Sequence, residues 1–133
     1  MSGDRGRPRP TARFQHDATD PRSSARIHDG SGEIAIRRLF RDQLTLPIHA
    51  EVWELPPGAS EGDHAHAGSD PSDNWEELYY VLSGTGTITI DGAEHPLAPG
   101  DAVLVPADVD HGLYAAGDES LRVMLIFGKP LSG

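Results

Sequence analysis

The residues of this sequence best suited to bind a metal ion are two histidines separated by one residue, a later glutamate and a third histidine. His64 and His66 flank Ala65, and on an extended strand residues two apart point to the same side. Glu77 begins an otherwise apolar run, where a carboxylate needs a partner because burying an unpaired charge is costly. His111 begins a further short run. These four residues are candidate metal ligands.

The donor atoms available in this chain are nitrogen and oxygen, because the sequence contains no cysteine. Three neutral imidazoles and one carboxylate suit Fe(II), Mn(II), Zn(II), Ni(II) or Cu(II) better than soft Cu(I). We expect one divalent transition metal ion, with Fe, Mn, Zn and Ni as the candidates. Four protein ligands leave two positions of an octahedral ion open, as a catalytic site requires. The alternative is that these are scattered surface residues of a chain with seven histidines.

Other side chains are candidates for a substrate pocket. Tyr79 is in phase with Glu77 on one predicted strand, so the two side chains share a face and are both candidates for catalysis. His49 and Trp53 share a face of an earlier strand, which points either to solvent or into the pocket. Met124 is a further pocket candidate.

Short extended runs separated by turn signals make up most of the chain after Gly32, and no window shows a sustained helical period. Asp91-Gly92 predicts a two-residue hairpin turn. Seven or eight strands in about a hundred residues indicate a sandwich or a barrel. The predicted strands lie near residues 34–36, 48–55, 78–82, 85–90, 102–105, 111–115 and 121–127.

We predict that residues 1–32, which are rich in Arg, Pro, Ser and Gly, form a mobile arm, because they hold too few apolar side chains to offset their ordering entropy. A contact between this arm and the domain is expected near Ile27. Residues 1–41 carry nine arginines against five acids, whereas residues 42–133 carry two basic residues against sixteen acids. This acidic body argues against binding to nucleic acid or to an anionic membrane. The absence of a membrane-length apolar run and of a signal sequence predicts a soluble, cytoplasmic protein.

Three histidines are expected to face solvent: His16, His28 and His95.

The order of these residues resembles the cupin superfamily. The first cupin motif consists of a glycine, five residues, H-x-H, three or four residues, a glutamate, six residues and a second glycine. Gly58, His64, His66, Glu77 and Gly84 reproduce this pattern, except that ten residues separate His66 from Glu77. The longer spacer, residues 67–76, is interpreted as an inserted loop at the mouth of a barrel.

The spacer also offers alternative carboxylate ligands. Only Glu77 keeps the six-residue step to Gly84, and it is therefore the preferred ligand. The alternatives are Asp70, Asp73 and Glu76.

The second cupin motif is present with two departures. Gly100, Pro106 and His111 stand at the positions of the motif glycine, proline and histidine. Asp108 replaces the second motif glycine, so the turn before His111 must be made by a residue that tolerates unusual backbone angles. Ala115 replaces the motif asparagine. Both changes leave the expected ligands intact.

The resemblance implies an all-β, double-stranded β-helix (jelly-roll) barrel over residues 33–133, with a metal bound near one end by His64, His66, Glu77 and His111. It also implies a small-molecule substrate and a homodimer formed through the N-terminal strand, where Ile34-Ala35-Ile36 offers an apolar edge.

Cupins use such a metal in several ways. The expected function is that of a metal-dependent enzyme acting on a small organic molecule, either as a dioxygenase or by the Lewis-acid chemistry of an isomerase, epimerase, cyclase or lyase. The alternative is a non-catalytic module that binds or senses a small molecule. The fold alone does not decide between them.

Overall fold

The structure, a computed structural model, describes residues 11–65 and 74–130, and these residues form ten strands and no helix. The all-β jelly-roll fold expected from the sequence is confirmed. Within the same residues no helix has the length and apolar character needed to cross a membrane. The strands are β1 (Ser23–Ala25), β2 (Ile34–Arg38), β3 (His49–Leu55), β4 (Ser60–His64), β5 (Glu76–Ser83), β6 (Gly86–Ile90), β7 (Ala93–Leu97), β8 (Ala102–Val105), β9 (His111–Ala115) and β10 (Leu121–Gly128).

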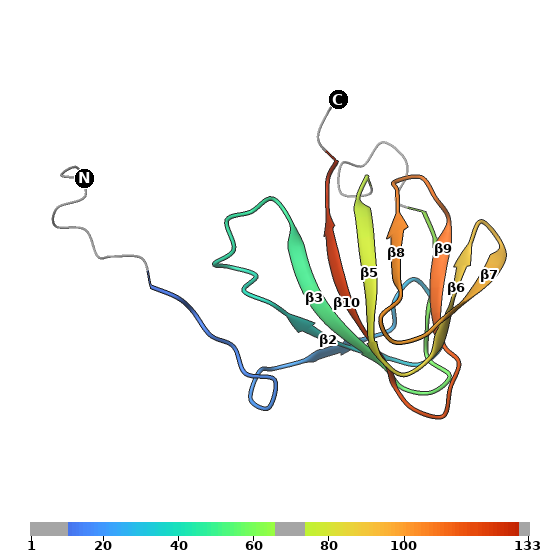
Figure 1. The fold of residues 1–133 in the computed structure, drawn as a ribbon, viewed down its shortest axis with the longest axis horizontal. Coiled ribbons are helices and arrows are strands. Elements are labelled where there is room, and N and C mark those ends of the chain that lie inside the picture. Colours follow the sequence, from blue (N-terminus) through green and yellow to red (C-terminus); the bar gives the residue numbers. More distant parts are fainter. Residues whose placement is uncertain (1–10, 66–73, 131–133) are drawn as a thin grey trace, which may run out of the picture.

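Two antiparallel sheets face each other. One sheet has the order β1-β2-β3-β10-β5-β8, and the other has the order β4-β9-β6-β7. Figure 1 shows β3, β10, β5 and β8 side by side, with β9, β6 and β7 beyond them. From β3 onward, strands that follow one another in the chain lie in different sheets, except for the β6–β7 hairpin. The chain therefore passes repeatedly between the sheets, and the ends of several strands meet at the same rim.

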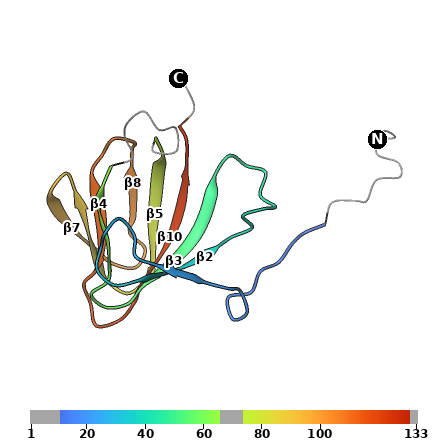
Figure 2. The ribbon, with the colours of Figure 1, turned by 180° about the vertical axis from the view of Figure 1, so that it is seen from behind.

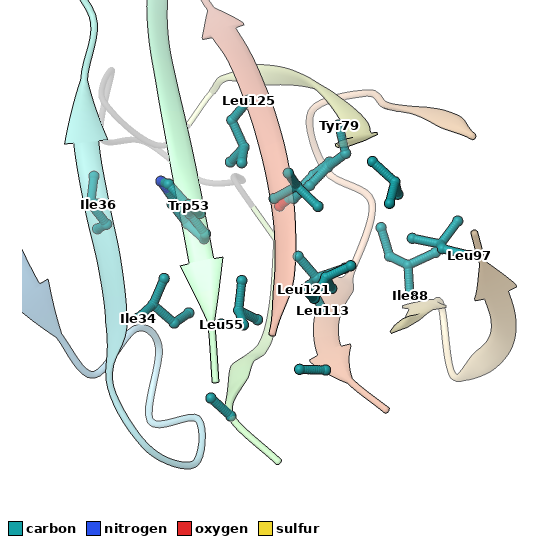
Figure 3. Packing of buried hydrophobic residues seen from close by; sticks show 14 of the residues in the cluster. Ile34, Ile36, Trp53, Leu55, Tyr79, Ile88, Leu97, Leu113, Leu121 and Leu125 are labelled. Atoms are coloured by element: carbon teal, nitrogen blue, oxygen red, sulfur yellow. The ribbon is translucent and has the colours of Figure 1, made fainter. Parts of the chain in front are cut away.

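β10 lies between β3 and β5 in the larger sheet, and its residues alternate strictly between buried and partly buried. Leu121, Val123, Leu125 and Phe127 are buried, and in the register with β3 and β5 they lie beside Trp53, Tyr79 and Val81 among others. Figure 3 shows such side chains meeting residues of the smaller sheet in one core. The inner face of the larger sheet is thus fixed by the alternation of β10.

Two turns that the sequence singles out have the backbone geometry expected of them. Asp91 and Gly92 join β6 to β7 with φ angles of 48° and 85°, the positive values that a two-residue hairpin requires. Asp108 adopts a φ of 72°, so an aspartate does make the turn in which cupins have a glycine. The hairpin and the unusual turn before His111 are therefore confirmed.

The segment before β2 belongs in part to the sheet. β1 pairs with β2, placing Ser24 opposite Ala35, and Ile27 forms a parallel bridge to Glu61. Residues 23–32 therefore contact the domain over more positions than the predicted contact near Ile27. Residues 1–10 lie outside the described part of the chain.

The prediction that Ile34-Ala35-Ile36 is an exposed sheet edge is wrong. β2 lies between β1 and β3, so both of its edges are paired. Ile34 and Ile36 are only 0% and 5% exposed because they are part of the core. The pairing of β2 with β1 could not be predicted from the sequence, because the covering strand, Ser23-Ser24-Ala25, has no large apolar residue.

Candidate metal centre

Three strand ends bring candidate ligands together. His64 ends β4 and His111 begins β9, and the two residues are partners in the register of the smaller sheet. Glu77 lies near the start of β5 in the larger sheet. Each of these residues offers one ligand atom, and the three atoms lie within 4.8 Å of one another. His66, the fourth predicted ligand, lies outside the described residues and stays a prediction.

Backbone carbonyls orient both imidazoles. Nδ1 of His64 lies 2.9 Å from the carbonyl oxygen of Gly62, and Nδ1 of His111 lies 2.9 Å from that of Val109. Because a carbonyl oxygen only accepts hydrogen bonds, each Nδ1 carries the proton, and each Nε2 is left as the ligand atom. A histidine whose second nitrogen donates to a carbonyl is the usual arrangement around a bound metal.

His111 and Glu77 are a buried pair. They are 0% and 4% exposed, and Nε2 of His111 lies 2.9 Å from Oε1 of Glu77. Burial by itself lowers the pKa of His111, but the hydrogen bonds that the imidazole donates to Glu77 and to the Val109 carbonyl, together with nearby carboxylates, outweigh burial and raise that pKa above 6.5. In the metal-free site a proton is therefore held between imidazole and carboxylate, and a bound cation displaces it.

A second buried carboxylate, which the sequence pattern did not reveal, lies beside these residues. Glu61 is 2% exposed, and its Oε2 lies 3.6 Å from Nε2 of His64. Burial, reinforced by the charge of Glu77, raises the pKa of Glu61 from 4.5 to about 8. Residues three apart on a regular strand point to opposite faces, but the register of β4 shifts between Glu61 and His64. That irregularity turns both side chains to the same site and has no clear signal in the sequence.

Tyr79 contacts both Glu61 and His111, one of the candidate ligands. Its side chain is completely buried, and its hydroxyl donates a hydrogen bond of 2.8 Å to Oε1 of Glu61. Its ring meets that of His111 edge to face, with 5.9 Å between centroids. Burial raises the pKa of Tyr79 well above 10, so the phenol stays protonated. Tyr79 and Glu77 share the inner face of β5, as predicted from their phase.

The remaining pocket candidates have different locations. His49 lies on the inner face in register with Phe127, and its ring contacts those of Phe127 and Trp75 at 5.1 and 5.6 Å. Trp53 is buried in the core, and its Nε1 donates to Glu51. The prediction that Met124 lines the pocket is wrong. Met124 is out of phase with the buried residues of β10 and therefore lies on the outer face of the sheet.

The alternative ligands and the other histidines can also be placed. Glu76 is exposed and out of phase with Glu77, so it does not join the cluster, whereas Asp70 and Asp73 lie outside the described residues. His16 and His95 are exposed, as predicted. His28 is exposed too, but its ring stacks on that of His64, a contact that the prediction of a purely solvent-facing residue did not include.

The donor set fits a divalent transition metal. Two imidazole nitrogens and a carboxylate lie within reach of one another, and both imidazoles are held in the tautomer that presents Nε2. A buried phenol and a second carboxylate adjoin them. The arrangement can therefore hold a cation next to a group that carries a proton.

A match to the family Cupin_2, described as a cupin domain, spans residues 51–127, and the chain belongs to this family. It is 34% identical over 93 residues to the dimethylsulfoniopropionate lyase DddW of Ruegeria pomeroyi, an alignment that covers 68% of this chain and 56% of the lyase. The chain thus spans little more than half of the length of that relative.

Two Thermotoga maritima matches extend over more of the chain. An oxalate-binding protein is 26% identical over 109 residues, covering 80% of this chain and 84% of that protein. The crystal structure of a predicted oxalate decarboxylase superposes with a TM-score of 0.78 at 21% identity, covering 89% of this chain and 100% of the other. This last likeness shows the fold.

Proposed function

We propose that this chain is a metal-dependent enzyme that moves a proton on a small organic molecule, as a lyase or an isomerase does. The observation that carries the proposal is the buried hydrogen bond from Tyr79 to Glu61 next to the imidazole and carboxylate ligands. Proton transfer by a positioned side chain typically contributes a factor of about 100 or more to a rate.

The metal ligands would be His64, Glu77 and His111, with His66 as a fourth. When bound there, an ion such as Fe, Mn, Zn or Ni supplies Lewis acidity to a carbonyl or carboxylate oxygen of the substrate. Neutral imidazole and carboxylate ligands suit each of these ions. The acidic body, residues 42–133, favours neutral or cationic substrates over polyanions.

Glu61, held in place by Tyr79, is the residue that would handle the proton. The Tyr79 hydroxyl stays protonated and donates to Oε1 of Glu61 over 2.8 Å, which fixes the position of that carboxyl group. With a pKa of about 8, Glu61 can take up or release a proton near neutral pH. Because both side chains are buried, bulk water does not compete for this hydrogen bond.

A lyase or isomerase fits this pair better than the dioxygenase that the sequence also allowed. Elimination and isomerisation both require a group that removes a proton from carbon. The Ruegeria pomeroyi relative, at 34% identity, is a lyase. Dimethylsulfoniopropionate is therefore the first substrate to test, followed by other small carboxylic acids.

The replacement Tyr79→Phe tests this function. Loss of the hydroxyl removes the hydrogen bond that positions Glu61 but no metal ligand, so we expect turnover to fall about 100-fold while the bound metal per chain stays unchanged. Turnover is measured by NMR in D₂O, which reveals product formation and deuterium uptake at carbon. Tyr114→Phe is the matched control, since Tyr114 is 46% exposed on β9. Equal turnover of Tyr79→Phe and the unaltered protein would refute the role of Tyr79.

A non-catalytic small-molecule binder is the second candidate. The oxalate-binding relative, which aligns with 80% of this chain, favours it. Oxalate would then raise the melting temperature of the metal-loaded protein, while mass spectrometry would detect no product from any substrate of the panel.

We also propose a homodimer, formed through the outer face of the larger sheet. Tyr80 and Leu104 are 43% and 60% exposed there, and a groove of about 300 Å³ lies between Leu78, Leu104 and Ile126. Apolar side chains in such a row favour contact with a second copy. Light scattering should give twice the chain mass, and Leu104→Glu should give the single-chain mass. A monomeric unaltered protein would refute the dimer.

A further inference from the structure

The segment of residues 27–31 is held against β4 by backbone hydrogen bonds. The N–H of Gly62 donates to the carbonyl of Ile27 over 3.0 Å, and the N–H of Ser60 donates to that of Ser31 over 2.8 Å. Figure 2 shows this blue segment beside the green strand β4. The segment therefore has a defined position along β4.

The contact depends on two glycines. A Cβ atom on Gly62 would lie 1.9 Å from the carbonyl oxygen of His28, and one on Gly30 would lie 1.9 Å from that of Ser60. Neither position can accept a side chain without moving backbone, because these distances are far below van der Waals contact. The two backbones approach each other as closely as glycine allows.

This approach lays the ring of His28 on the ring of His64. The two rings are stacked, with 3.5 Å between centroids and 17° between planes. His28 and Asp29 have φ angles of 50° and 58°, a left-handed conformation that is uncommon for two successive residues other than glycine. Such a conformation persists only where the surrounding contacts impose it. The position of the His28 ring is therefore set by the contacts between its segment and β4.

The plane of the His64 ring decides where its ligand atom points, because the lone pair of a neutral imidazole nitrogen lies in the ring plane. The carbonyl of Gly62, 2.9 Å from Nδ1, fixes one point of this ring but leaves the ring free to tilt about that contact. The stacked ring of His28 limits the tilt, as does the ring of His111, whose centroid is 4.3 Å away at 52°. These contacts together aim Nε2 at the cluster that His64 forms with Glu77 and His111.

His28 itself does not belong to that cluster. Its ligand atom lies within 4.8 Å of those of Glu61 and His64, but not of those of Glu77 and His111. The rings of His28 and His64 also lie in nearly parallel planes, so their lone pairs do not converge on one ion. Any effect of His28 on the metal is therefore exerted through His64.

We propose that His28 is a positioning residue of the metal centre, which holds the ring of His64 in the plane that presents Nε2 to the ion. It is supplied by the segment before β2 and belongs to neither cupin motif. The inference rests on the metal site of the proposed function and deepens it. Residues 27–31 thus become part of the metal centre, although His28 contributes no ligand atom.

The replacements His28→Ala and His28→Phe separate stacking from metal ligation. Alanine removes the ring, whereas phenylalanine keeps a ring that can stack on His64 but has no nitrogen donor. Titration of the metal-free protein with Co²⁺, followed by visible absorption, should give His28→Ala an altered spectrum and a dissociation constant at least about tenfold higher, as is typical when the support of a ligand is removed. His28→Phe should bind Co²⁺ with the affinity and spectrum of the unaltered protein.

A further variant moves the segment without changing His28. The added Cβ of Gly30→Ala would collide with the Ser60 carbonyl, so the segment shifts away from β4 and the same loss of Co²⁺ affinity as in His28→Ala is expected. His95→Ala, at an exposed position of β7, is the matched control and should change neither affinity nor spectrum. Circular dichroism checks that all variants remain folded.

The outcomes separate this inference from the proposed function. If His28→Ala binds Co²⁺ with unchanged affinity and spectrum while His111→Ala does not bind it, His28 does not position His64 and the metal centre still stands. If the unaltered protein does not bind Co²⁺, both proposals fail.

Two further results would overturn the inference. An equal loss of affinity in His28→Phe and His28→Ala would show that the nitrogen atoms of His28 are needed and that stacking is not its role. Loss of affinity in Gly30→Ala without loss in His28→Ala would show that the segment acts on the site without His28.

Discussion

Replacement of His111 by alanine is expected to abolish metal binding and, with it, any turnover that depends on the metal. The imidazole is completely buried, presents Nε2 to the site and is hydrogen-bonded to Glu77. Its removal takes away one ligand and leaves the Glu77 carboxylate buried without this partner, which also costs about 3 kcal/mol or more of stability. Elemental analysis after reconstitution should give less than about a tenth of the metal bound by the unaltered protein.

The matched control for this experiment is His95→Ala. His95 lies on β7 in the same sheet as His111, but it is exposed and remote from the ligand cluster. It should bind as much metal as the unaltered protein and unfold at the same temperature. Retention of a full equivalent of metal by His111→Ala would show that this cluster is not the metal centre. A melting curve distinguishes loss of the ligand from loss of the fold.

Replacement of Glu61 by glutamine is expected to remove a large pH dependence from the stability of the metal-free protein. The pKa of Glu61 is about 8 in the folded chain because of burial and the nearby charge of Glu77, against an ordinary value of 4.5. The native state therefore holds a proton that the unfolded chain releases, so stability is fully present below pH 4.5 and is lost as the pH rises through about 8. A shift of this size corresponds to about 5 kcal/mol in all.

Glutamine is neutral at every pH and keeps an oxygen that can accept the hydrogen bond from Tyr79. The difference in unfolding free energy between Glu61→Gln and the unaltered protein should therefore grow by about 4 kcal/mol in favour of the variant between pH 4.5 and 8. Urea denaturation in the presence of a chelator measures it. Glu94→Gln, on an exposed position of β7, should leave the pH profile unchanged. Parallel profiles for the unaltered protein and Glu61→Gln would show that the buried carboxyl is not protonated at neutral pH.

The parts of the site that could be predicted from the sequence follow from periodicity along one strand. Glu77 and Tyr79 share the inner face of β5 because they are two residues apart, and no other information is needed. The same reasoning could have placed Met124, which is in phase with the charged Arg122 and out of phase with Leu121, Val123 and Leu125.

The parts that could not be predicted depend on irregular backbone and on contacts between distant segments. Glu61 joins His64 through a register shift in β4, whereas strict alternation would separate them. His28 reaches His64 because Gly30 and Gly62 permit close contact between segments about thirty residues apart. Neither feature changes the local pattern of apolar residues, which is what periodicity detects.

The pairing of β1 with β2 has a consequence for how the chain behaves when it is shortened. A chain that began at Glu33 would lose β1 and leave one edge of β2 unpaired, beside the apolar side chains of Ile34 and Ile36. Unpaired edges of this kind recruit strands from other molecules. We therefore expect the three small residues of β1 to lower the tendency of the protein to aggregate, although they add almost nothing to its core.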